Sequence, residues 1–197
     1  TTDIAIYHGG TVKHTTVISL GGNQVTNDIA VGLRTPAAEA EKIKKEHGFS
    51  IAAMAGEDEV IEVPSVGGRG PRSVGRRMLG EIIEPRMEEI FDLVNQEIIR
   101  SGHENFVSAG IVLTGGTASL DGIVELAEQV FNLPVRVGCP SGITGLVDVV
   151  NSPMFATGVG LVCYGSRHAT RNDFQRGTEN VFNKISFRMK GWIKEFF

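Results

Sequence analysis

Short apolar runs alternate with helical patterns along this chain, and glycine clusters separate them. The runs have the two-residue period of β-strands, and the longer segments repeat apolar residues every three or four positions, as helices do. Alternation of this kind predicts an α/β fold. The predicted strands are a hairpin over 2–20 and single strands over 49–53, 60–63, 109–113 and 135–137; the predicted helices cover 24–33, 36–47, 74–101, 119–131 and 154–162.

The longest predicted helix, 74–101, follows a basic glycine-rich loop over 67–72. Ser73 is its expected N-terminal cap, since a serine hydroxyl can accept from the free amides of the first turn. Pro85 lies inside the apolar pattern. Proline lacks the N–H that the helix needs and its ring clashes with the preceding turn, so we expect a kink or a break there.

The segment 181–197 is basic, although the chain as a whole has a formal net charge of −4. An acidic balance does not suggest nucleic-acid binding, whereas a basic tail on an acidic body suggests an anionic partner for the tail. Cys139 and Cys163 are isolated in the sequence, without metal or disulfide spacing, which fits a reducing cytoplasm. The scattered histidines and serines form no recognisable catalytic set, and no metal site is predicted.

Apolar residues in 181–197 recur in steps of three and four, so they form one stripe of an amphipathic helix. Such a helix can pack on its own domain, bind a membrane surface or fit a calmodulin-type partner. The polar linker 165–180 before it, its cationic face and its terminal aromatic residues favour the membrane, since basic residues gain about 1 kcal/mol each near anionic lipid. The predicted membrane-binding residues are Phe182, Ile185, Met189, Lys190, Trp192, Ile193, Lys194, Phe196 and Phe197.

Two segments could contact a nucleotide. Residues 111–119 form an apolar strand that ends in Gly115-Gly116, where a backbone can approach a flat ligand closely. Glu41, Lys44 and Lys45 share one face of the helix 36–47. Each pattern alone is more typical of an ordinary structural element, namely an αβ turn and a solvated helix with an internal salt bridge.

Taken in order, these segments resemble the actin and Hsp70 superfamily. Thr1-Thr2-Asp3-Ile4-Ala5 is similar to the end of its second phosphate loop, 40–45 to its ribose-binding and base-binding helix, Gly115-Gly116-Thr117 to its adenosine turn, and 156–161 to its second connecting helix. The resemblance implies ATP with Mg²⁺ as cofactor of the intact protein. It implies these cofactor-binding residues: Thr1, Thr2, Glu41, Lys44, Lys45, Gly115, Gly116 and Thr117.

The glycines of that phosphate loop and the superfamily's first half have no counterpart in these residues. A strand pattern also starts at the first residues, and the sequence begins with Thr1 instead of methionine. We therefore expect a fragment that binds ATP poorly by itself.

A more specific resemblance runs over nearly the whole chain. Residues 63–69, Pro71-Arg72-Ser73, Glu84-Pro85-Arg86 and 110–116 closely resemble the FtsA family of bacterial cell-division proteins. The family is actin-like, with a ribonuclease H-like fold in which helices flank a mixed sheet. The resemblance implies subdomain 2A over 1–48 and 107–164, subdomain 2B over 49–106, a linker over 165–180 and a membrane-targeting helix over 181–197.

The FtsA resemblance also implies partners and a location. In that family the C-terminal tail of the tubulin-like protein FtsZ docks on 2B near the start of the long helix, which makes Arg69, Arg72, Arg77 and Arg86 the candidates for binding it. The alternative is that these arginines neutralise nearby glutamates such as Glu81, Glu84 and Glu88. Further implications are self-association into filaments, contacts with other division proteins and a place on the cytoplasmic face of the inner membrane at the division site.

Two other functions within the superfamily remain open. A sugar or acetate kinase would need a catalytic carboxylate outside this sequence and has no use for an amphipathic tail. An Hsp70-like chaperone would need a β-sandwich after the nucleotide domain. The sequence therefore favours a structural adaptor with weak ATPase activity at most.

Overall fold

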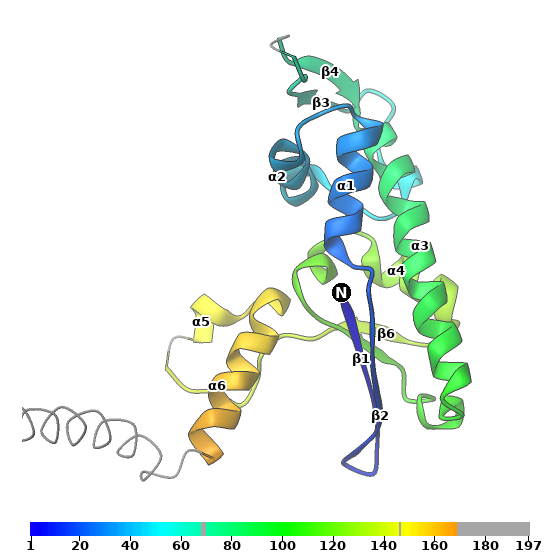
Figure 1. The fold of residues 1–197 in the computed structure, drawn as a ribbon, viewed down its shortest axis with the longest axis vertical. Helices are drawn as coiled ribbons and strands as arrows, with labels where there is room; N and C mark the ends of the chain where they lie inside the picture. Colours follow the sequence, from blue (N-terminus) through cyan, green and yellow to red (C-terminus); the bar gives the residue numbers. More distant parts are fainter. Residues whose placement is uncertain (68–69, 146, 169–197) are drawn as a thin grey trace, which may run out of the picture. The chain divides into compact units, whose positions relative to one another are not determined.

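The structure, a computed structural model, describes residues 1–67, 70–145 and 147–168 (Figure 1). The chain divides into two compact units, Thr1–Ala156 and Thr157–Phe197. The strands are β1 (Thr2–His8), β2 (Thr11–Ile18), β3 (Val60–Val63), β4 (Arg72–Gly75), β5 (Ile111–Leu113) and β6 (Val135–Val137). The helices are α1 (Gly22–Gly32), α2 (Ala37–His47), α3 (Arg76–Arg100), α4 (Ile123–Phe131), α5 (Val147–Val150) and α6 (Ala156–His168), with 3₁₀ turns η1 (Ala52–Met54), η2 (Glu104–Phe106), η3 (Gly116–Ser119) and η4 (Pro153–Phe155).

The predicted α/β class is confirmed. The strands pair as two antiparallel sheets, β1–β2 and β3–β4, and one parallel sheet, β5–β6. The parallel pair is joined by α4, the helical crossover that parallel strands require. Parallel and antiparallel pairing are thus both present, as expected of a mixed α/β fold, in three separate pairs within the described part of the chain.

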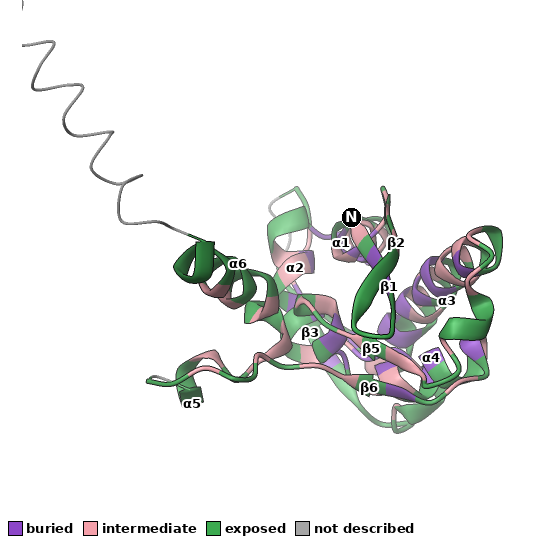
Figure 2. Ribbon diagram, turned by 90° about the horizontal axis from the view of Figure 1, so that it is seen from below, coloured by how far each residue is buried: buried purple, intermediate pink, exposed green. Residues whose placement is uncertain are grey.

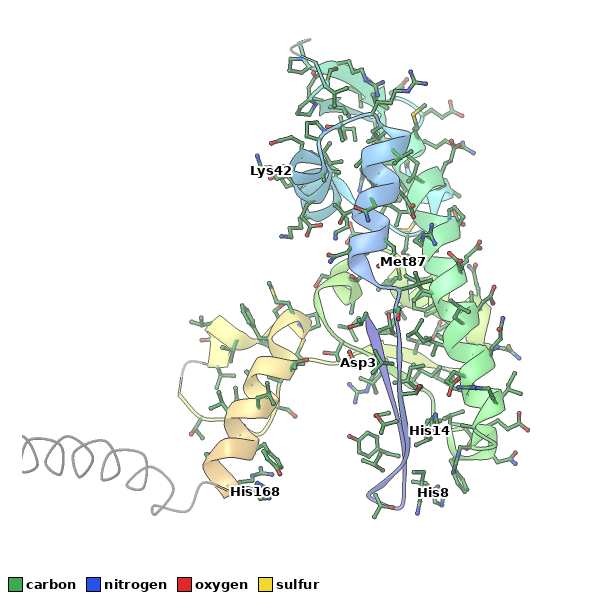
Figure 3. All side chains as sticks on the ribbon, in the orientation of Figure 1. Asp3, His8, His14, Lys42, Met87 and His168 are labelled. Atoms are coloured by element: carbon green, nitrogen blue, oxygen red, sulfur yellow. The ribbon has the colours of Figure 1, made fainter. Side chains whose placement is uncertain are left out.

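The β1–β2 hairpin follows its sequence pattern closely. Ile4 and Ile6 are buried while the residues between and beside them are more exposed, which is the period of a strand with one covered face. Gly9 and Gly10 have φ of 57° and 75°, as a two-residue hairpin turn requires. Near this turn His14 Nε2 lies 3.1 Å from Glu97 Oε1, which ties the hairpin to α3 (Figure 3).

The core of the first unit is built by α1, α3 and α4, on which buried residues concentrate (purple in Figure 2). Helix α1 lies beside α3, and α3 also packs on α4 (Figure 1). Apolar residues spaced three and four apart produce these buried faces. The largest fully buried apolar side chains are Phe49, Ile29, Leu33, Leu79, Ile83, Leu126, Val25 and Val63.

Helix α3 runs without interruption through Pro85, so of the kink or break predicted there the break is wrong. A proline removes one helical hydrogen bond, but its φ remains compatible with the helix. The buried stripe of α3, which includes Ile83 and Met87 on either side of the proline, is packed against the core. Tertiary packing of this stripe outweighs the local cost.

The start of α3 also differs from the prediction. Ser73 does not cap the helix, because Arg72–Gly75 forms strand β4 and α3 begins at Arg76. Val74 pairs with Ile61 across the β3–β4 sheet, and both side chains are buried. A strand of four residues next to a glycine-rich loop has no distinct local pattern, so its partner strand determines it.

The predicted strand over 49–53 is wrong. Phe49 forms a single parallel bridge with Asp121, and the chain then turns into η1. The first amide of η1, at Ala52, donates to the Glu84 carboxylate on α3 at 2.8 Å. A side chain on a distant helix therefore ends the extended segment.

Two further boundaries differ from the predictions. The helix predicted over 119–131 starts at Ile123, after the 3₁₀ turn η3 and Gly122, whose φ is 74°. Helix α6 continues to His168, so the first four residues of the predicted linker 165–180 are helical. The rest of that linker, from residue 169, and the predicted amphipathic helix 181–197 lie outside the described residues.

Candidate functional site

Lys44 on α2 is the centre of a polar cluster at the N-terminus of α1. Its side chain is 10% exposed, and its ammonium donates to Gly22 O at 3.0 Å and Thr26 Oγ1 at 2.8 Å. The third contact is an ion pair with Glu41 Oε2 at 2.6 Å. An ammonium group has three donors, and these three acceptors use all of them.

Glu41 accepts from several donors at once. Thr26 Oγ1 and the Lys44 ammonium contact its Oε2, and Lys45 Nζ lies 3.2 Å from its Oε1. Burial alone would raise the pKa of Glu41, but these hydrogen bonds and the Lys44 charge outweigh it and lower the pKa from 4.5 to about 2. The carboxylate therefore stays ionised, and Oε1 keeps one lone pair for a further donor.

Close approaches to Gly21 and Gly22 bring the predicted Thr117 and Thr1 to the same cluster. A Cβ added to Gly22 would lie 2.5 Å from Thr117 Oγ1 and 3.5 Å from Lys44 Nζ. A Cβ on Gly21 would lie 2.7 Å from the carbonyl oxygen of Thr1. At Gly21 the close atoms belong to the Thr1 backbone, so only glycine fits there, and at Gly22 a larger residue would have to displace the Thr117 hydroxyl. The Gly21-Gly22 turn thus brings three chain segments together. Thr2 lies beside it, with Oγ1 donating to Leu20 O at 2.8 Å.

The Gly115-Gly116 turn lies at the end of β5. Gly115 has a φ of 93°, which favours glycine, and its amide donates to Pro153 O at 2.9 Å. Thr114 Oγ1 lies within 3.1 Å of both Pro153 O and Gly138 O. The side of Gly116 where a Cβ would stand has no atom within 4 Å among the described residues, so that backbone is accessible.

Of the predicted cofactor-binding residues, Thr1, Glu41, Lys44 and Thr117 thus meet around the Gly21-Gly22 turn. The predicted Lys45 lies at the edge of this cluster, with a side chain that is 68% exposed. Two members of this cluster were not predicted from the sequence, Gly22 and Thr26. The Gly21-Gly22 pair resembles ordinary punctuation, and only the fold brings Thr26 opposite Lys44.

The predicted partner-binding arginines divide into different environments. Arg72 is exposed at the start of β4 and donates to the carbonyl of Leu33 at the end of α1. Arg77 pairs with Glu81 at 3.3 Å, as the neutralisation alternative predicts. Arg86 is bound to Asp28 and Glu89, which raises its pKa above the ordinary arginine value, with the Asp28 hydrogen bond as the largest cause. Arg69 lies outside the described residues.

A surface groove of about 630 Å³ opens beside Arg72. It lies between the end of α1, the loop before β4 and the first turn of α3. Its lining combines two guanidinium groups with exposed apolar side chains, Val66 and Met78 being 53% and 47% exposed. The lining residues are Gly32, Arg34, Ser65, Val66, Gly70, Arg72 and Met78.

The predicted membrane-binding residues between 182 and 197 lie outside the described residues. Within the described part of the chain, no helix is both long and apolar enough to cross a membrane. The same residues contain no group of three histidine, cysteine or acidic side chains placed to hold a metal ion.

The fold is actin-like. A crystal structure of MreB 5 of Spiroplasma citri bound to AMPPNP superposes with a TM-score of 0.62 over 90% of this chain and 51% of that one, at 18% identity. The ethanolamine utilization protein EutJ of Carboxydothermus hydrogenoformans superposes with a TM-score of 0.53 over 80% of this chain and 43% of its own, at 20% identity. Identities this low show the fold alone.

Sequence similarity identifies the family. A family model described as "Cell division protein FtsA" matches residues 1–160. Cell division protein FtsA of Pseudomonas aeruginosa is 54% identical over 165 residues, 84% of this chain and 40% of its own. Cell division protein FtsA of Escherichia coli K12 is 44% identical over 201 residues, which are 98% of this chain and 47% of the relative. The chain belongs to the FtsA family of cell division proteins, and it spans about half the length or less of these relatives.

Proposed function

We propose that this chain is the part of a cell-division adaptor that binds the C-terminal tail of FtsZ at the groove beside Arg72 and binds the membrane through 181–197. Family membership supports the role in division. The groove is the observation that carries the proposal, because it combines apolar surface with guanidinium groups at the start of α3. A partly acidic and partly apolar tail needs both.

The arginines of this region have different roles in the proposal. Arg72 uses one donor on Leu33 O and has others for a peptide carboxylate, since a guanidinium carries five N–H donors. Arg77 lies close in sequence on α3, with its Glu81 partner exposed, so a stronger acceptor can displace that pair. Arg86 is engaged with Asp28 and Glu89 and contributes through the packing of α1 on α3.

The polar cluster around Lys44 forms one wall of a nucleotide site in the full-length protein. Its residues fit a ribose: Glu41 Oε1 has a lone pair for a hydroxyl donor, and the exposed Lys45 ammonium lies next to it. All three Lys44 donors are used within the protein, so this residue positions Glu41 and the Gly21-Gly22 turn. ATP with Mg²⁺ would supply the negative charge, and the open side of the Gly116 backbone leaves room for the nucleotide to approach.

The amphipathic segment 181–197 provides the membrane end of the adaptor. A single helix of this length gives reversible binding, because it lacks a second anchor. Several copies side by side would stay bound to the membrane for longer, and self-association of an actin-like body would supply these copies. The adaptor would act at the cytoplasmic face of the inner membrane.

Vesicle recruitment tests both ends of the proposed adaptor. The full-length protein is mixed with vesicles containing anionic lipid and a fluorescent FtsZ tail peptide, and the pellet is assayed for protein and peptide. We expect the unchanged protein and the peptide both to pellet with the vesicles. The Trp192→Glu variant should no longer pellet but should still bind the peptide in solution. The Arg72→Glu variant should pellet without the peptide.

Arg136→Glu is the matched control, since Arg136 is an exposed arginine on β6 away from the groove lining. It should behave as the unchanged protein does. Unchanged peptide recruitment by Arg72→Glu would remove the groove from the proposal, and unchanged pelleting of Trp192→Glu would remove the membrane segment.

A further inference from the structure

We infer that Arg34 is a specificity-determining residue of the groove, where its guanidinium binds a carboxylate of the docked tail segment. The inference rests on the proposed function, because it concerns how the same groove selects its peptide. The sequence pattern did not indicate Arg34, which stands alone at the end of a helix. Its backbone conformation is the first observation that points to it.

Arg34 has a φ of 46°, in the left-handed region that glycine favours. It follows α1, at the position where helices commonly end in a left-handed glycine. Among the described residues, one other non-glycine residue has a positive φ: Asn132, at the end of α4. Asparagine tolerates this region because its short side chain can bond locally, whereas an arginine there is uncommon.

Helix stability does not explain an arginine at this position. A cation near the C-terminus of α1 interacts favourably with the helix dipole. That gain is no larger than the steric cost of a left-handed side chain. Glycine would avoid the cost and keep the hydrogen bonds that end α1, in which the amide of residue 34 donates to Val31 O and the amide of Thr35 donates to Ala30 O.

The left-handed turn instead places the Arg34 side chain in the groove lining. Arg34 is exposed there beside Arg72, and within the described chain neither residue has an ion pair. The groove therefore presents two arginines next to the apolar surface of Val66 and Met78. Strained backbone at a binding surface is a common sign that the side chain serves the ligand.

This arrangement selects the chemistry of the occupant. Two guanidinium groups favour an extended segment that carries more than one carboxylate, because each fork can donate two parallel hydrogen bonds to one. The exposed apolar side chains favour a hydrophobic residue between or beside those carboxylates. The acidic and apolar tail segment of the proposed function has this composition.

The test compares Arg34→Gly, Arg34→Gln and Asn132→Gly in the full-length protein, with the same fluorescent tail peptide. Because glycine suits the backbone at both sites, we expect the two glycine variants to have a Tm equal to or above that of the unchanged protein. Arg34→Gly and Arg34→Gln should bind the peptide about tenfold more weakly, with a shallower dependence on salt. Asn132→Gly should bind it normally.

The outcomes separate this inference from the proposed function. If the unchanged protein binds the peptide and Arg72→Glu does not, while Arg34→Gly binds normally, the role of Arg34 is wrong and the groove stands. If Arg34→Gly lowers the Tm while Asn132→Gly does not, Arg34 is a structural residue and the inference is overturned. Absence of binding by the unchanged protein would overturn both.

Discussion

Arg86 on α3 and Asp28 on α1 form a two-point ion pair, with Nε 2.5 Å from Oδ2 and Nη2 3.2 Å from Oδ1. Both side chains are about two-thirds covered, at 27% and 31% exposure. The planar guanidinium matches the planar carboxylate, so the pair fixes the relative orientation of the two helices. It joins residues 58 positions apart in the sequence.

Removing this pair should destabilise the packing of α1 on α3. Because it is partly buried, we expect Arg86→Ala and Asp28→Ala each to lower the free energy of unfolding by about 1–2 kcal/mol, between the values for exposed and buried pairs. Chemical denaturation of the single and double variants gives the coupling energy. Arg77→Ala, which breaks an exposed pair, should cost less than about 0.5 kcal/mol. Equal losses in Arg77→Ala and Arg86→Ala would contradict the assignment.

The ionised Glu41 should make stability depend on pH in the acid range. Its folded-state pKa of about 2 lies below the ordinary 4.5, so the charged form is favoured by folding. The stabilisation is complete above pH 4.5 and is lost as the pH falls towards 2. The difference in Tm between the unchanged protein and Glu41→Gln should therefore be constant above pH 5 and shrink below pH 4. A difference that grows on acidification would exclude this account.

Loss of the Lys44 ammonium should lower the free energy of unfolding far more than loss of the Lys45 ammonium. Lys44→Met leaves Gly22 O, Thr26 Oγ1 and the Glu41 carboxylate without a shared donor, so we expect unfolding to become easier by about 2–3 kcal/mol. Lys45→Met removes an exposed partner of the same carboxylate and should cost about 0.5 kcal/mol or less. Urea titrations of both variants compare them directly, and similar midpoints would show that Lys44 is not the centre of the cluster.

Gly80 should not tolerate a methyl group. A Cβ there would lie 2.6 Å from two ring carbons of the buried Phe49 and 2.8 Å from the Ala52 backbone. Overpacking of this kind costs about 1–3 kcal/mol, against a gain of about 1 kcal/mol in helix propensity. We expect Gly80→Ala to lower the free energy of unfolding by about 1–2 kcal/mol in thermal or chemical denaturation.

Gly75→Ala is the control for this prediction, since no described atom lies within 4 Å of its added Cβ and its φ is −59°. Its stability should change by less than about 0.5 kcal/mol, because the lower N-cap preference of alanine is offset by the smaller conformational freedom that it gives the unfolded chain. A neutral Gly80→Ala would mean that η1 moves away from α3 at little cost.

Much of the fold was predictable because local pattern and tertiary environment agree. The alternation of Ile4 and Ile6 with polar residues, the Gly9-Gly10 turn and the helix 36–47 all appear as expected. In these segments the residues that must be buried already have the period of the element that buries them. The FtsA resemblance also came from contiguous motifs, which a sequence displays directly.

The wrong predictions of secondary structure share one cause: contacts with other parts of the fold determine the conformation of these segments. Strand β4 exists because β3 pairs with it, η1 is fixed by Glu84 on α3, and α3 continues through Pro85 because its flanking residues are buried in the core. Each of these partners lies outside the local window that a propensity pattern covers, and Glu84 is 32 positions from Ala52. Local propensity differs by only tenths to about 1 kcal/mol between conformations for most residues, which is less than such contacts contribute.

The class, the order of the elements and the candidacy of Glu41, Lys44 and Arg72 followed from the amino-acid sequence alone. The role of each residue came from the folded arrangement: Lys44 is covered and holds Glu41 in place, and Arg86 joins two helices. The folded arrangement also brought Arg34 into the groove, through a left-handed turn that no pattern indicates. The role of a charged side chain depends on its burial and its partners, and both come from packing between segments far apart in the chain.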